Sequence, residues 1–432
     1  MTKVAIIGTG YVGLTTGACF SDMGHEVICA DIDTLKIARL QRGHIPILEH
    51  GIDQLVATGI EGSGLDESRL AFTDSPADAC LDAEIVFLCV PTPTTDDGSA
   101  DLTYIEAAVR TIASSLPSTS VLVTKSTVPV GSTTFIEHIL EQVTGFSIPV
   151  VSNPEFLREG NAVYDFMNPD RIIIGSAYPL AARRVGALYE SLDAPILYTD
   201  PVTAELIKYA ANGFLATKLS FVNAIAAVCE AVEADIQDVL TGLSYDHRIG
   251  PAYLQPGPGW GGSCFPKDTR ALLKMSKSAG YPFRFLQGVL DTNDEQIDRI
   301  MDKLDAVTEL WGHNPVAIWG LTFKAGTDDL RDSPALKLID TLRRRNFISA
   351  WDPTVQVGNA HIPDEVKICT DPYEACIDAS ALVVLTEWPE IVALDPHIVA
   401  GLMKDLAVID TRNILDRNDW EQAGFRYQGN GR

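Results

Sequence analysis

Short apolar runs alternate with longer amphipathic ones through the first half of the chain. Apolar runs of strand length occur at residues 4–7, 27–30, 85–90, 121–125, 148–151 and 171–174, with helical patterns between them. Strands that alternate with helices predict a mostly parallel sheet covered on both faces. We therefore expect a doubly wound α/β domain over residues 1–199.

A long helical pattern follows this first domain. No proline interrupts residues 202–233, where Lys208 and Asn212 lie four positions apart and so share one helix face. The uncharged neighbours of Lys208 favour at least partial burial of its amine, although a solvated lysine is the simpler interpretation of that residue alone. We expect residues 200–299 to form a central helical linker and dimerisation domain.

A second α/β pattern occupies the last third of the chain. Strand-like runs recur at residues 316–324, 348–351, 381–385 and 406–409, which predicts a smaller doubly wound domain over residues 300–432. The loop after its first strand offers Lys324 and Arg331 to a phosphate or a sugar. The expected fold is thus α/β, with two doubly wound Rossmann-like domains joined by a long central helix.

Composition and charge narrow the classes of partner. The formal net charge is -25 over 432 residues, which argues against a nucleic-acid partner because phosphates require a basic face. The eight cysteines form no CxxC pair, so we expect a reducing compartment and no structural metal. The chain opens without a signal-peptide pattern, and no run of about eighteen apolar residues lacks a charge. These features predict a cytoplasmic protein that does not enter a membrane.

A glycine motif lies at the first predicted strand–helix junction. Residues 8–13 read GTGYVG, a strand precedes them, a helix follows, and Asp31 ends the second predicted strand. This context is typical of a dinucleotide site, in which the glycines admit the pyrophosphate to a helix N-terminus and the acid binds the ribose hydroxyls. Because an acid at that position repels a 2′-phosphate, Asp31 favours NAD over NADP.

A second glycine-rich stretch ends in a cysteine. Residues 257–268 read GPGWGGSCFPKD, and a helical pattern over residues 269–279 follows. Proline fits a first helical turn, so Cys264 is expected at a helix N-terminus, close to Lys267. Such an environment lowers a thiol pKa, which makes Cys264 a candidate nucleophile and the neighbouring Asp268 a candidate base or orienting group. The alternative is a small buried cysteine, but the glycines suggest a close approach of the backbone to a ligand.

Three further loops follow predicted strands of the first domain. They read PTPT at residues 91–94, STVPVG at residues 126–131 and NPEFLRE at residues 153–159. Ligands of open α/β sheets bind beyond the carboxyl ends of the strands, so these loops are expected to line the cofactor and the reacting centre. Arg248, in a polar insert before the glycine-rich loop, is a candidate phosphate or sugar contact.

Taken together, these motifs resemble the UDP-glucose/GDP-mannose dehydrogenase family, and within it the UDP-glucose 6-dehydrogenases. The matching segments span nearly the whole chain in order; they are GTGYVG, VPTPT, STVPVG, NPEFLREG, KYAANGFLATKLSFVN, GWGGSCFPKD and GLTFKAGTDDLRDSP. The resemblance implies NAD-dependent oxidation of the C6 hydroxymethyl of UDP-glucose to a carboxylate. It further implies that Cys264 attacks the intermediate aldehyde to give a thiohemiacetal, which is oxidised to a thioester and hydrolysed.

The resemblance also implies roles for individual residues. The expected catalytic residues are Cys264, Lys208, Asn212, Asp268, Glu155 and Thr127. The expected NAD contacts are Gly8, Gly10, Tyr11, Val12, Gly13, Asp31, Lys36, Thr92, Thr127, Glu159, Lys267 and Arg331. The expected substrate contacts are Glu155, Phe156, Leu157, Lys208, Asn212, Arg248, Tyr253, Gly261, Lys324 and Arg412, with Arg248 acting across the interface of a homodimer.

Other functions remain open at this point. A GDP-mannose 6-dehydrogenase, or another nucleotide-sugar 6-dehydrogenase, shares the GGSC and PKD elements. A two-electron hydroxyacid dehydrogenase also places a lysine and an asparagine on a long helix, and in that case Cys264 would be structural. A non-catalytic sensor of NAD or of a sugar nucleotide is a third possibility, and it would form no NADH.

Overall fold

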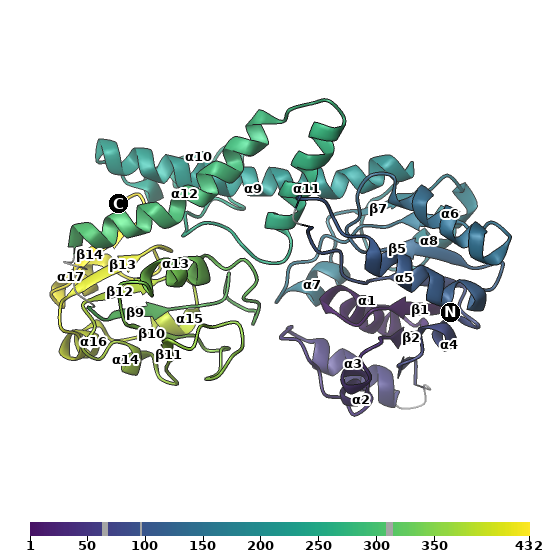
Figure 1. The fold of residues 1–432 in the computed structure, drawn as a ribbon, viewed down its shortest axis with the longest axis horizontal. Coiled ribbons are helices and arrows are strands. Elements are labelled where there is room, and N and C mark those ends of the chain that lie inside the picture. Colours follow the sequence, from purple (N-terminus) through teal and green to yellow (C-terminus); the bar gives the residue numbers. More distant parts are fainter. Residues whose placement is uncertain (63–67, 96, 308–313) are drawn as a thin grey trace. The chain divides into compact units, whose positions relative to one another are not determined.

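The computed structural model describes residues 1–62, 68–95, 97–307 and 314–432. Contacts within the chain divide it into two compact units (Figure 1). The first comprises residues 1–211 and 270–279, and the second comprises residues 212–269 and 280–432. The predicted three-part division at residues 199 and 299 stays a prediction.

The first unit contains an eight-stranded sheet in its described residues. Its strand order is β3-β2-β1-β4-β5-β6-β7-β8, and every neighbouring pair is parallel except β6 with β7. The strands are β1 (Lys3–Ile7), β2 (Glu26–Ala30), β3 (Leu70–Thr73), β4 (Ile85–Leu88), β5 (Val121–Thr124), β6 (Val150–Ser152), β7 (Ile172–Gly175) and β8 (Ile196–Thr199). The helices around them are α1 (Tyr11–Asp22), α2 (Thr34–Leu40), α3 (Ile52–Glu61), α4 (Pro76–Cys80), α5 (Thr103–Ile112), η1 (Ala113–Ser115), α6 (Ser132–Thr144), α7 (Ala162–Met167) and α8 (Pro179–Ala187).

The second unit contains a six-stranded sheet in which each neighbouring pair of described strands is parallel. The strand order is β11-β10-β9-β12-β13-β14. The strands are β9 (Val316–Trp319), β10 (Ile348–Trp351), β11 (Val366–Ile368), β12 (Ala381–Val384), β13 (Ala407–Asp410) and β14 (Arg426–Gly429). The helices are α10 (Ile236–Ser244), α12 (Arg284–Val307), α13 (Pro334–Leu342), α14 (Pro372–Ala375), α15 (Pro389–Val392), α16 (Pro396–Leu402) and α17 (Arg417–Gln422). The sequence also predicts a helical run over residues 283–311, and residues 308–311 of that run lie outside the described residues.

Both faces of each sheet are buried, as the apolar runs predict. Along β1, Val4 and Ile6 pack into one core cluster, while Ala5 and Ile7 pack into a second cluster on the opposite face. Strand β9 repeats this arrangement in the second unit, where its alternate side chains enter two different clusters. Side chains alternate across a strand, so a strand without polar positions requires helices on both faces. The expected doubly wound fold is confirmed in both units.

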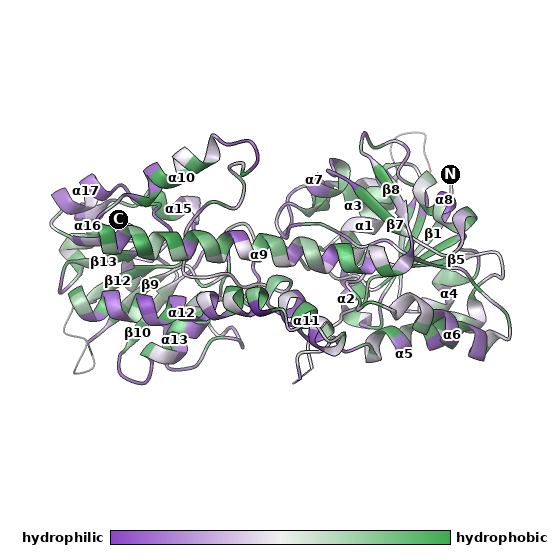
Figure 2. Cartoon of the chain, turned by 90° about the horizontal axis from the view of Figure 1, so that it is seen from above, coloured by the Kyte–Doolittle hydropathy of each residue, from purple (hydrophilic) through white to green (hydrophobic). Residues whose placement is uncertain are grey.

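Helix α9 (Pro201–Val232) is a single helix of 32 residues that belongs to both units. It is apolar along most of its length (Figure 2), and among the described residues it is the one helix long and apolar enough to cross a membrane by length and composition. Buried polar side chains interrupt the apolar sequence of this helix. Glu205, Lys208, Asn212 and Asn223 each have a hydrogen-bond partner within the protein. Buried polar side chains with hydrogen-bond partners inside the protein are typical of a helix in a protein core.

The same turn follows the first strand of each sheet. Gly8 has φ +101°, and a Cβ there would lie 2.6 Å from the backbone oxygen of Cys89. Gly320 has φ +88°, and a Cβ there would lie 2.4 Å from the Cβ of Thr386. Each turn passes closely over the end of the neighbouring strand, β4 or β12, at the point where the strand order reverses. That point is the usual ligand-binding position of open α/β sheets.

An acid at the end of the second strand fixes each of these turns. In the second unit Asp352 follows β10, and its Oδ2 accepts from the N–H of Leu321 at 2.8 Å and of Thr322 at 3.1 Å. The Nε1 of Trp388 donates to the same oxygen at 3.0 Å. Asp352 is buried and fully engaged. The carboxylate therefore stabilises the turn itself and has no exposed face for a ribose, consistent with the missing glycine spacing in this domain.

We predict that Asp352→Ala destabilises the second unit by about 3 kcal/mol, because two buried N–H groups and the Trp388 indole lose their acceptor. All six tryptophans lie beyond residue 211, so denaturant unfolding followed by tryptophan fluorescence reports on this unit. The exposed Asp364 provides the matched control, Asp364→Ala. Equal unfolding midpoints for the two variants would contradict the role of Asp352.

Candidate active site

The glycine turn of the first unit forms a cradle at the start of α1. A Cβ on Gly13 would lie 1.8 Å from the backbone oxygen of Gly8, so α1 packs against the turn without any space for a side chain. At Gly10 the position of a Cβ is open, with no atom within 4 Å, and no side chain caps the helix there. This space at the N-terminus of α1 fits the pyrophosphate of a dinucleotide.

Asp31 lies beside this cradle and is held in place by its neighbours. Its Oδ2 accepts from the N–H of Thr9 at 2.9 Å, from the Thr9 hydroxyl at 2.7 Å and from the Lys36 ammonium at 2.8 Å. Burial opposes ionisation of Asp31, but the hydrogen bonds from Lys36, Thr9 and Asp33 outweigh it and hold the pKa below the ordinary value. An ionised carboxylate at this position can accept hydrogen bonds from ribose hydroxyls, as predicted for NAD.

The three loops expected at the carboxyl ends of the strands do lie together. The Thr92 hydroxyl donates to the backbone oxygen of Thr127 at 2.8 Å, and the Ser126 hydroxyl donates to that of Val90 at 2.7 Å. These bonds join the loop after β4 to the loop after β5. Asn153, which follows β6, donates its N–H to Thr124 at the end of β5. The parallel register places all three loops at one edge of the sheet.

A buried ion pair lies at this edge. The Lys208 ammonium contacts Oε1 of Glu155 at 3.0 Å, and both side chains are almost completely buried. The predicted burial of Lys208 is thus confirmed. The other carboxylate oxygen of Glu155 accepts from the N–H of Leu157 at 2.6 Å, and the ring of Phe156 lies 5.3 Å from the ammonium. Burial opposes ionisation of Glu155, but the charge of Lys208 and the Leu157 N–H outweigh it, so its pKa lies below the ordinary value.

Two further buried carboxylates hold the loops at this edge of the sheet. The sequence did not indicate either of them. Glu205, one helical turn before Lys208 on α9, accepts from the N–H of Gly131 at 2.6 Å and of Thr133 at 2.8 Å, at the start of α6. Glu49 accepts from the N–H of Gly160 at 2.8 Å and of Ala162 at 2.7 Å, at the start of α7. A helix N-terminus requires acceptors, but the sequence does not indicate which distant acid supplies them.

Cys264 begins helix α11 (Phe265–Ser278), as predicted. Its backbone oxygen accepts from the N–H of Asp268 at 2.9 Å, which makes it the residue at which the helix starts. The periodic pattern begins at Thr269, and the helix itself begins four residues earlier, because Pro266 in its first turn needs no N–H acceptor. The thiol is partly exposed, and the Ser263 hydroxyl lies 3.5 Å from its sulfur.

Asp268 is the polar centre of the cysteine loop. It is 1% exposed, and its two carboxylate oxygens accept from the Asn212 amide at 2.6 Å and from the Lys267 ammonium. The carboxylate therefore orients Asn212 on α9 and Lys267, which lies three positions after Cys264 in the sequence. Lys208 lies one turn before Asn212 on the same helix. The lysine that Asp268 contacts is Lys267, whereas Lys208 pairs with Glu155.

The glycines of the cysteine loop approach the chain itself rather than open space. A Cβ on Gly261 would lie 2.1 Å from the backbone oxygen of Asp332, and a Cβ on Gly262 would lie 2.8 Å from the ring of Phe323. The N–H of Gly262 donates to the oxygen of Arg331 at 2.9 Å. The expectation that these glycines also admit a ligand stays a prediction. They allow the cysteine loop to pack on the loop after β9.

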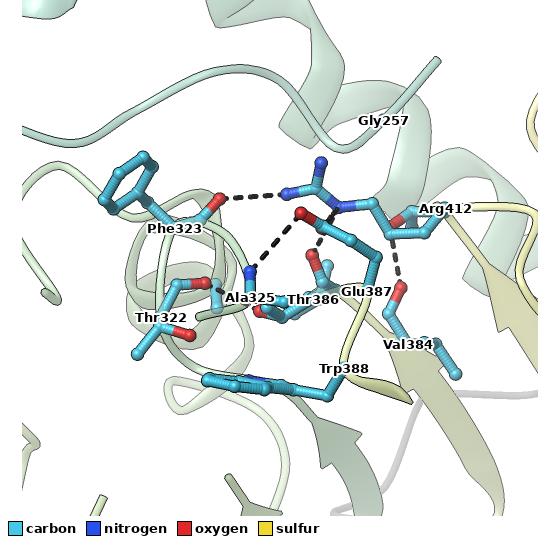
Figure 3. Close-up of polar contacts among 12 residues, drawn as sticks. Gly257, Thr322, Phe323, Ala325, Val384, Thr386, Glu387, Trp388 and Arg412 are labelled. Atoms are coloured by element: carbon cyan, nitrogen blue, oxygen red, sulfur yellow. Dashed lines mark hydrogen bonds and ion pairs between the residues drawn. The ribbon is translucent and has the colours of Figure 1, made fainter. Parts of the chain in front are cut away.

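Arg412 lies at the carboxyl edge of the second sheet (Figure 3). Its Nε donates to the oxygen of Leu385 at 2.8 Å, and its Nη2 donates to that of Phe323 at 3.0 Å. The same Nε lies 3.1 Å from Oε2 of Glu387, whose other oxygen accepts from the N–H of Ala325 at 3.3 Å. Arg412 thus joins the loops after β9, β12 and β13. The sequence comparison placed Arg412 among the substrate contacts, but it did not identify Glu387.

The remaining predicted basic contacts have acidic or aromatic neighbours in the chain. Arg248 donates to both carboxylate oxygens of Asp246, and Arg331 donates to both oxygens of Asp329. The ammonium of Lys324 lies 5.7 Å from the centre of the Phe323 ring. These three basic residues lie on loops of the second unit, where a phosphate would compete with their present neighbours.

Tyr253 occupies an unusual backbone conformation. Its φ is +61°, a region that residues with a side chain rarely adopt, and its ring lies 6.3 Å from that of Phe265 at the start of α11. Backbone strain of this kind is concentrated at functional sites. The position fits the predicted substrate contact.

We predict that native protein takes up one carboxamidomethyl group from iodoacetamide, at Cys264. All eight cysteines lie in the described ranges, and the other seven are buried; burial raises the pKa of Cys80 and of Cys89 to about 12. Only thiolates react. Peptide mapping by mass spectrometry identifies the labelled site, Cys264→Ser is the control that should take up none, and two or more labels on native protein would contradict the prediction.

Comparison with known proteins connects these sites to a family. Models of the UDP-glucose/GDP-mannose dehydrogenase family match three segments, namely its NAD binding domain at residues 2–193, its central domain at residues 202–295 and its UDP binding domain at residues 317–417. The chain is 43% identical to the UDP-glucose 6-dehydrogenase TuaD of Bacillus subtilis (strain 168), over 100% of this chain and 94% of the relative. It is also 43% identical to the UDP-glucose 6-dehydrogenase of Rhizobium meliloti (strain 1021), over 100% of this chain and 99% of the relative.

Solved structures agree with this relationship. A UDP-glucose dehydrogenase from the hyperthermophilic archaeon Pyrobaculum islandicum has a TM-score of 0.91 and 33% identity, over 100% of this chain and 98% of that chain. A UDP-D-ManNAc dehydrogenase from Pyrococcus horikoshii has a TM-score of 0.88 and 26% identity, over 99% of both chains. With the NAD cradle, the buried lysine and the partly exposed cysteine in the expected elements, this chain belongs to the UDP-glucose/GDP-mannose dehydrogenase family of NAD-dependent oxidoreductases.

Proposed function

We propose that this chain oxidises the C6 hydroxymethyl of UDP-glucose to a carboxylate, giving UDP-glucuronate, in two successive oxidations that each consume one NAD. The observation that carries the proposal is the thiol of Cys264. Among the eight cysteines, all of them in the described ranges, it alone is partly exposed, and it lies at the start of a helix beside the Asn212–Asp268–Lys267 cluster. The relatives named UDP-glucose 6-dehydrogenase, 43% identical along the whole chain, support the choice of substrate.

NAD supplies the hydride acceptor for both oxidations. The open space at Gly10 supports placing its pyrophosphate at the start of α1, between the turn at Gly8 and the helix at Gly13. Asp31, with Lys36 beside it, is then the acceptor for the ribose hydroxyls. The further contacts that the family motifs propose are Tyr11, Val12, Thr92, Thr127, Glu159, Lys267 and Arg331.

The first oxidation converts the primary alcohol into an aldehyde. The C6 hydrogen leaves as hydride, and the hydroxyl proton must pass to a base. We assign stabilisation of the developing alkoxide to Lys208, with the Asn212 amide donating beside it one turn further along α9. The buried Glu155 carboxylate next to Lys208 accepts the displaced proton or holds the lysine in position.

The second oxidation requires that the aldehyde stays bound. The Cys264 thiolate adds to the carbonyl carbon, and the carbonyl electron pair moves to oxygen, where Lys208 and Asn212 stabilise it. The adduct is a thiohemiacetal that still carries the C6 hydrogen. Loss of that hydrogen as hydride restores the carbonyl and gives a thioester to Cys264.

Hydrolysis of the thioester completes the reaction. Glu155 is ionised, because its pKa lies below the ordinary value, and so it can accept a proton from an attacking water. We assign Thr127 and Asp268 to orienting that water. Addition of the water gives a tetrahedral oxyanion, and its collapse breaks the carbon–sulfur bond, releases the carboxylate and restores the thiolate.

The family motifs also propose the residues that contact the sugar nucleotide. In the first unit the contacts are Phe156 and Leu157, which lie beside Glu155. In the second unit they are Tyr253, Gly261, Lys324 and Arg412. The strained backbone of Tyr253 and the position of Arg412 at the carboxyl edge of the second sheet support these assignments.

We also propose that the enzyme is a homodimer in which Arg248 reaches the active site of the partner subunit. Helix α9 exposes four apolar side chains along one face, at positions seven, seven and four residues apart; they are Phe214, Phe221, Val228 and Val232. Such a stripe is typical of a helix that packs on a second copy. Arg248 is 78% exposed and paired only locally with Asp246, which leaves its guanidinium accessible to a second subunit.

A cytoplasmic location is part of the same proposal. The cysteines are free and seven of the eight, all in described ranges, are buried, as expected for a protein of a reducing compartment. Both the proposed substrate and NAD are also soluble metabolites.

We predict two NADH formed per UDP-glucose consumed, measured by absorbance at limiting sugar nucleotide with chromatographic identification of the product. Cys264→Ser should still bind UDP-glucose and NAD but lose at least about 1000-fold in turnover, since the hydroxyl is a far weaker nucleophile. One NADH per sugar would indicate a two-electron dehydrogenase, and binding without any NADH would indicate a sensor. Run with UDP-N-acetylmannosamine and GDP-mannose as alternative substrates, the same assay decides among the nucleotide sugars.

A mixture of two inactive variants tests the role of Arg248. Arg248→Ala lacks the contributed arginine and Cys264→Ser lacks the nucleophile, so each homodimer should be inactive. If Arg248 acts on the partner, each mixed dimer has one complete site, and random pairing restores about a quarter of the wild-type rate. Coexpression produces the mixed dimer, and Arg248→Lys is the conservative control. A mixture as inactive as its components would place Arg248 in its own subunit's site.

A further inference from the structure

A second lysine is buried close to the Glu155–Lys208 pair and has no role in the reaction described above. Lys125 follows β5, directly before the Ser126-Thr127 loop, and is 5% exposed. Its ammonium donates to Oδ1 of Asn153 at 3.0 Å and to the hydroxyl of Tyr189 at 3.1 Å. The Tyr189 hydroxyl donates to the same Asn153 oxygen at 2.6 Å. Within the residues that the structure describes, the direct polar partners of Lys125 are therefore neutral.

Burial of the Lys125 ammonium costs free energy, and the fold alone does not require a charge at this position. A buried ammonium without a carboxylate loses its hydration and gains only neutral hydrogen bonds. The aromatic rings of Tyr189 and Phe166, at 5.4 and 5.9 Å from the nitrogen, return part of that loss. A methionine would fill the same volume without a charge. The lysine is therefore expected to have a function for its charge.

The charged and titratable groups around Lys125 come from every element packed against it. Cys89 follows β4, Glu155 follows β6, Lys208 lies on α9, and Tyr189 follows α8. Burial lowers the pKa of Lys125 to about 8; Cys89 and Glu155 oppose this change and Lys208 adds to it. Electrostatic coupling is mutual. The charge on Lys125 thus favours the carboxylate form of Glu155.

We propose that Lys125 is a positioning residue for the oxidation, a buried positive charge that holds Asn153 against Tyr189 and keeps Glu155 ionised. This inference rests on the proposed function of the Glu155–Lys208 pair. Lys125 lies one residue before Ser126 and two before Thr127, so it is tied to the loop that the water-orienting Thr127 belongs to. It acts through its neighbours, because the Asn153 and Tyr189 side chains enclose its ammonium.

The test is the pH profile of kcat for Lys125→Met, a neutral replacement of similar volume. Without the charge, Glu155 holds its proton to higher pH, so the acidic limb of kcat should move upward by about one pH unit. Tyr189→Phe removes a hydrogen-bond partner but keeps the charge, and it should leave the limb in place. Lys125→Arg should restore the wild-type limb. A Lys125→Met enzyme that is slower at every pH with an unmoved limb would show a structural role and overturn the proposal.

Asn153→Asp gives a second measurement if Lys125→Met does not fold. A carboxylate at position 153 neutralises the ammonium in place and should also move the acidic limb upward. An unmoved limb in this variant overturns the proposal.

A measurement without turnover separates this proposal from the proposed function. The folded pKa of Lys125 lies below the unfolded value, so the unfolded chain binds more protons between about pH 8 and 10.5, and the wild type gains stability as pH rises through that window. The melting temperature of Lys125→Met should therefore exceed that of wild type by the largest margin below pH 8, and the margin should shrink towards pH 10.5. If UDP-glucose yields no NADH, this shrinking margin still supports the buried charge, and a constant margin overturns it.

Discussion

The ion pair between Glu155 and Lys208 is the interaction on which the carboxyl edge of the first sheet depends. It connects the long helix α9 to the carboxyl edge of the first sheet, with both charges removed from water. Breaking such a pair by removing one partner typically costs about 3 to 5 kcal/mol, because a lone buried charge remains. Each of the two buried charges therefore requires the other, and the surrounding loops hold both side chains in place. Glu205 attaches the STVPVG loop to α9 one turn away, and Glu49 holds the loop that follows Glu155.

In each sheet an acid after the second strand accepts hydrogen bonds from the turn after the first strand. The two acids differ in how deeply they are buried. Asp31 fixes the turn after β1 with one side still accessible, so that its carboxylate can also serve a ribose. Asp352 fixes the turn after β9 with every oxygen engaged inside the protein, including the indole of Trp388. The same arrangement of strand, glycine turn and acid thus occurs in both units, with a partly accessible acid in the first and a buried acid in the second. At the corresponding edge of the second sheet, Arg412 is held by two backbone oxygens and by Glu387.

The fold was predictable because the central strands carry continuous apolar runs. The four strands that the pattern did not predict, β3, β8, β11 and β14, are the four edge strands of the two described sheets. Edge strands have one neighbour and one partly solvated side, so their sequences alternate or carry polar residues; β8 (Ile196–Thr199) is nowhere fully buried. The bounds of the other elements differ from expectation by a few residues. The run at residues 316–324 forms a strand over Val316–Trp319, and α11 begins at Phe265, so that it takes in the Pro-Lys-Asp segment after Cys264.

The sequence by itself determined the alternating strands and helices, the dinucleotide turn with its acid, and the likeness that assigns roles to Lys208, Asn212, Cys264 and Asp268. Those features are local, since each is written in consecutive residues or in a fixed helical spacing. Only the tertiary structure decided which groups meet. In the folded chain Lys208 pairs with Glu155, and Asp268 accepts hydrogen bonds from Asn212 and Lys267. Gly261 packs against the backbone of Asp332. Lys125 is buried among neutral hydrogen-bond partners. These contacts join residues far apart in the chain, and local periodicity contains no information about the partner of a buried charge.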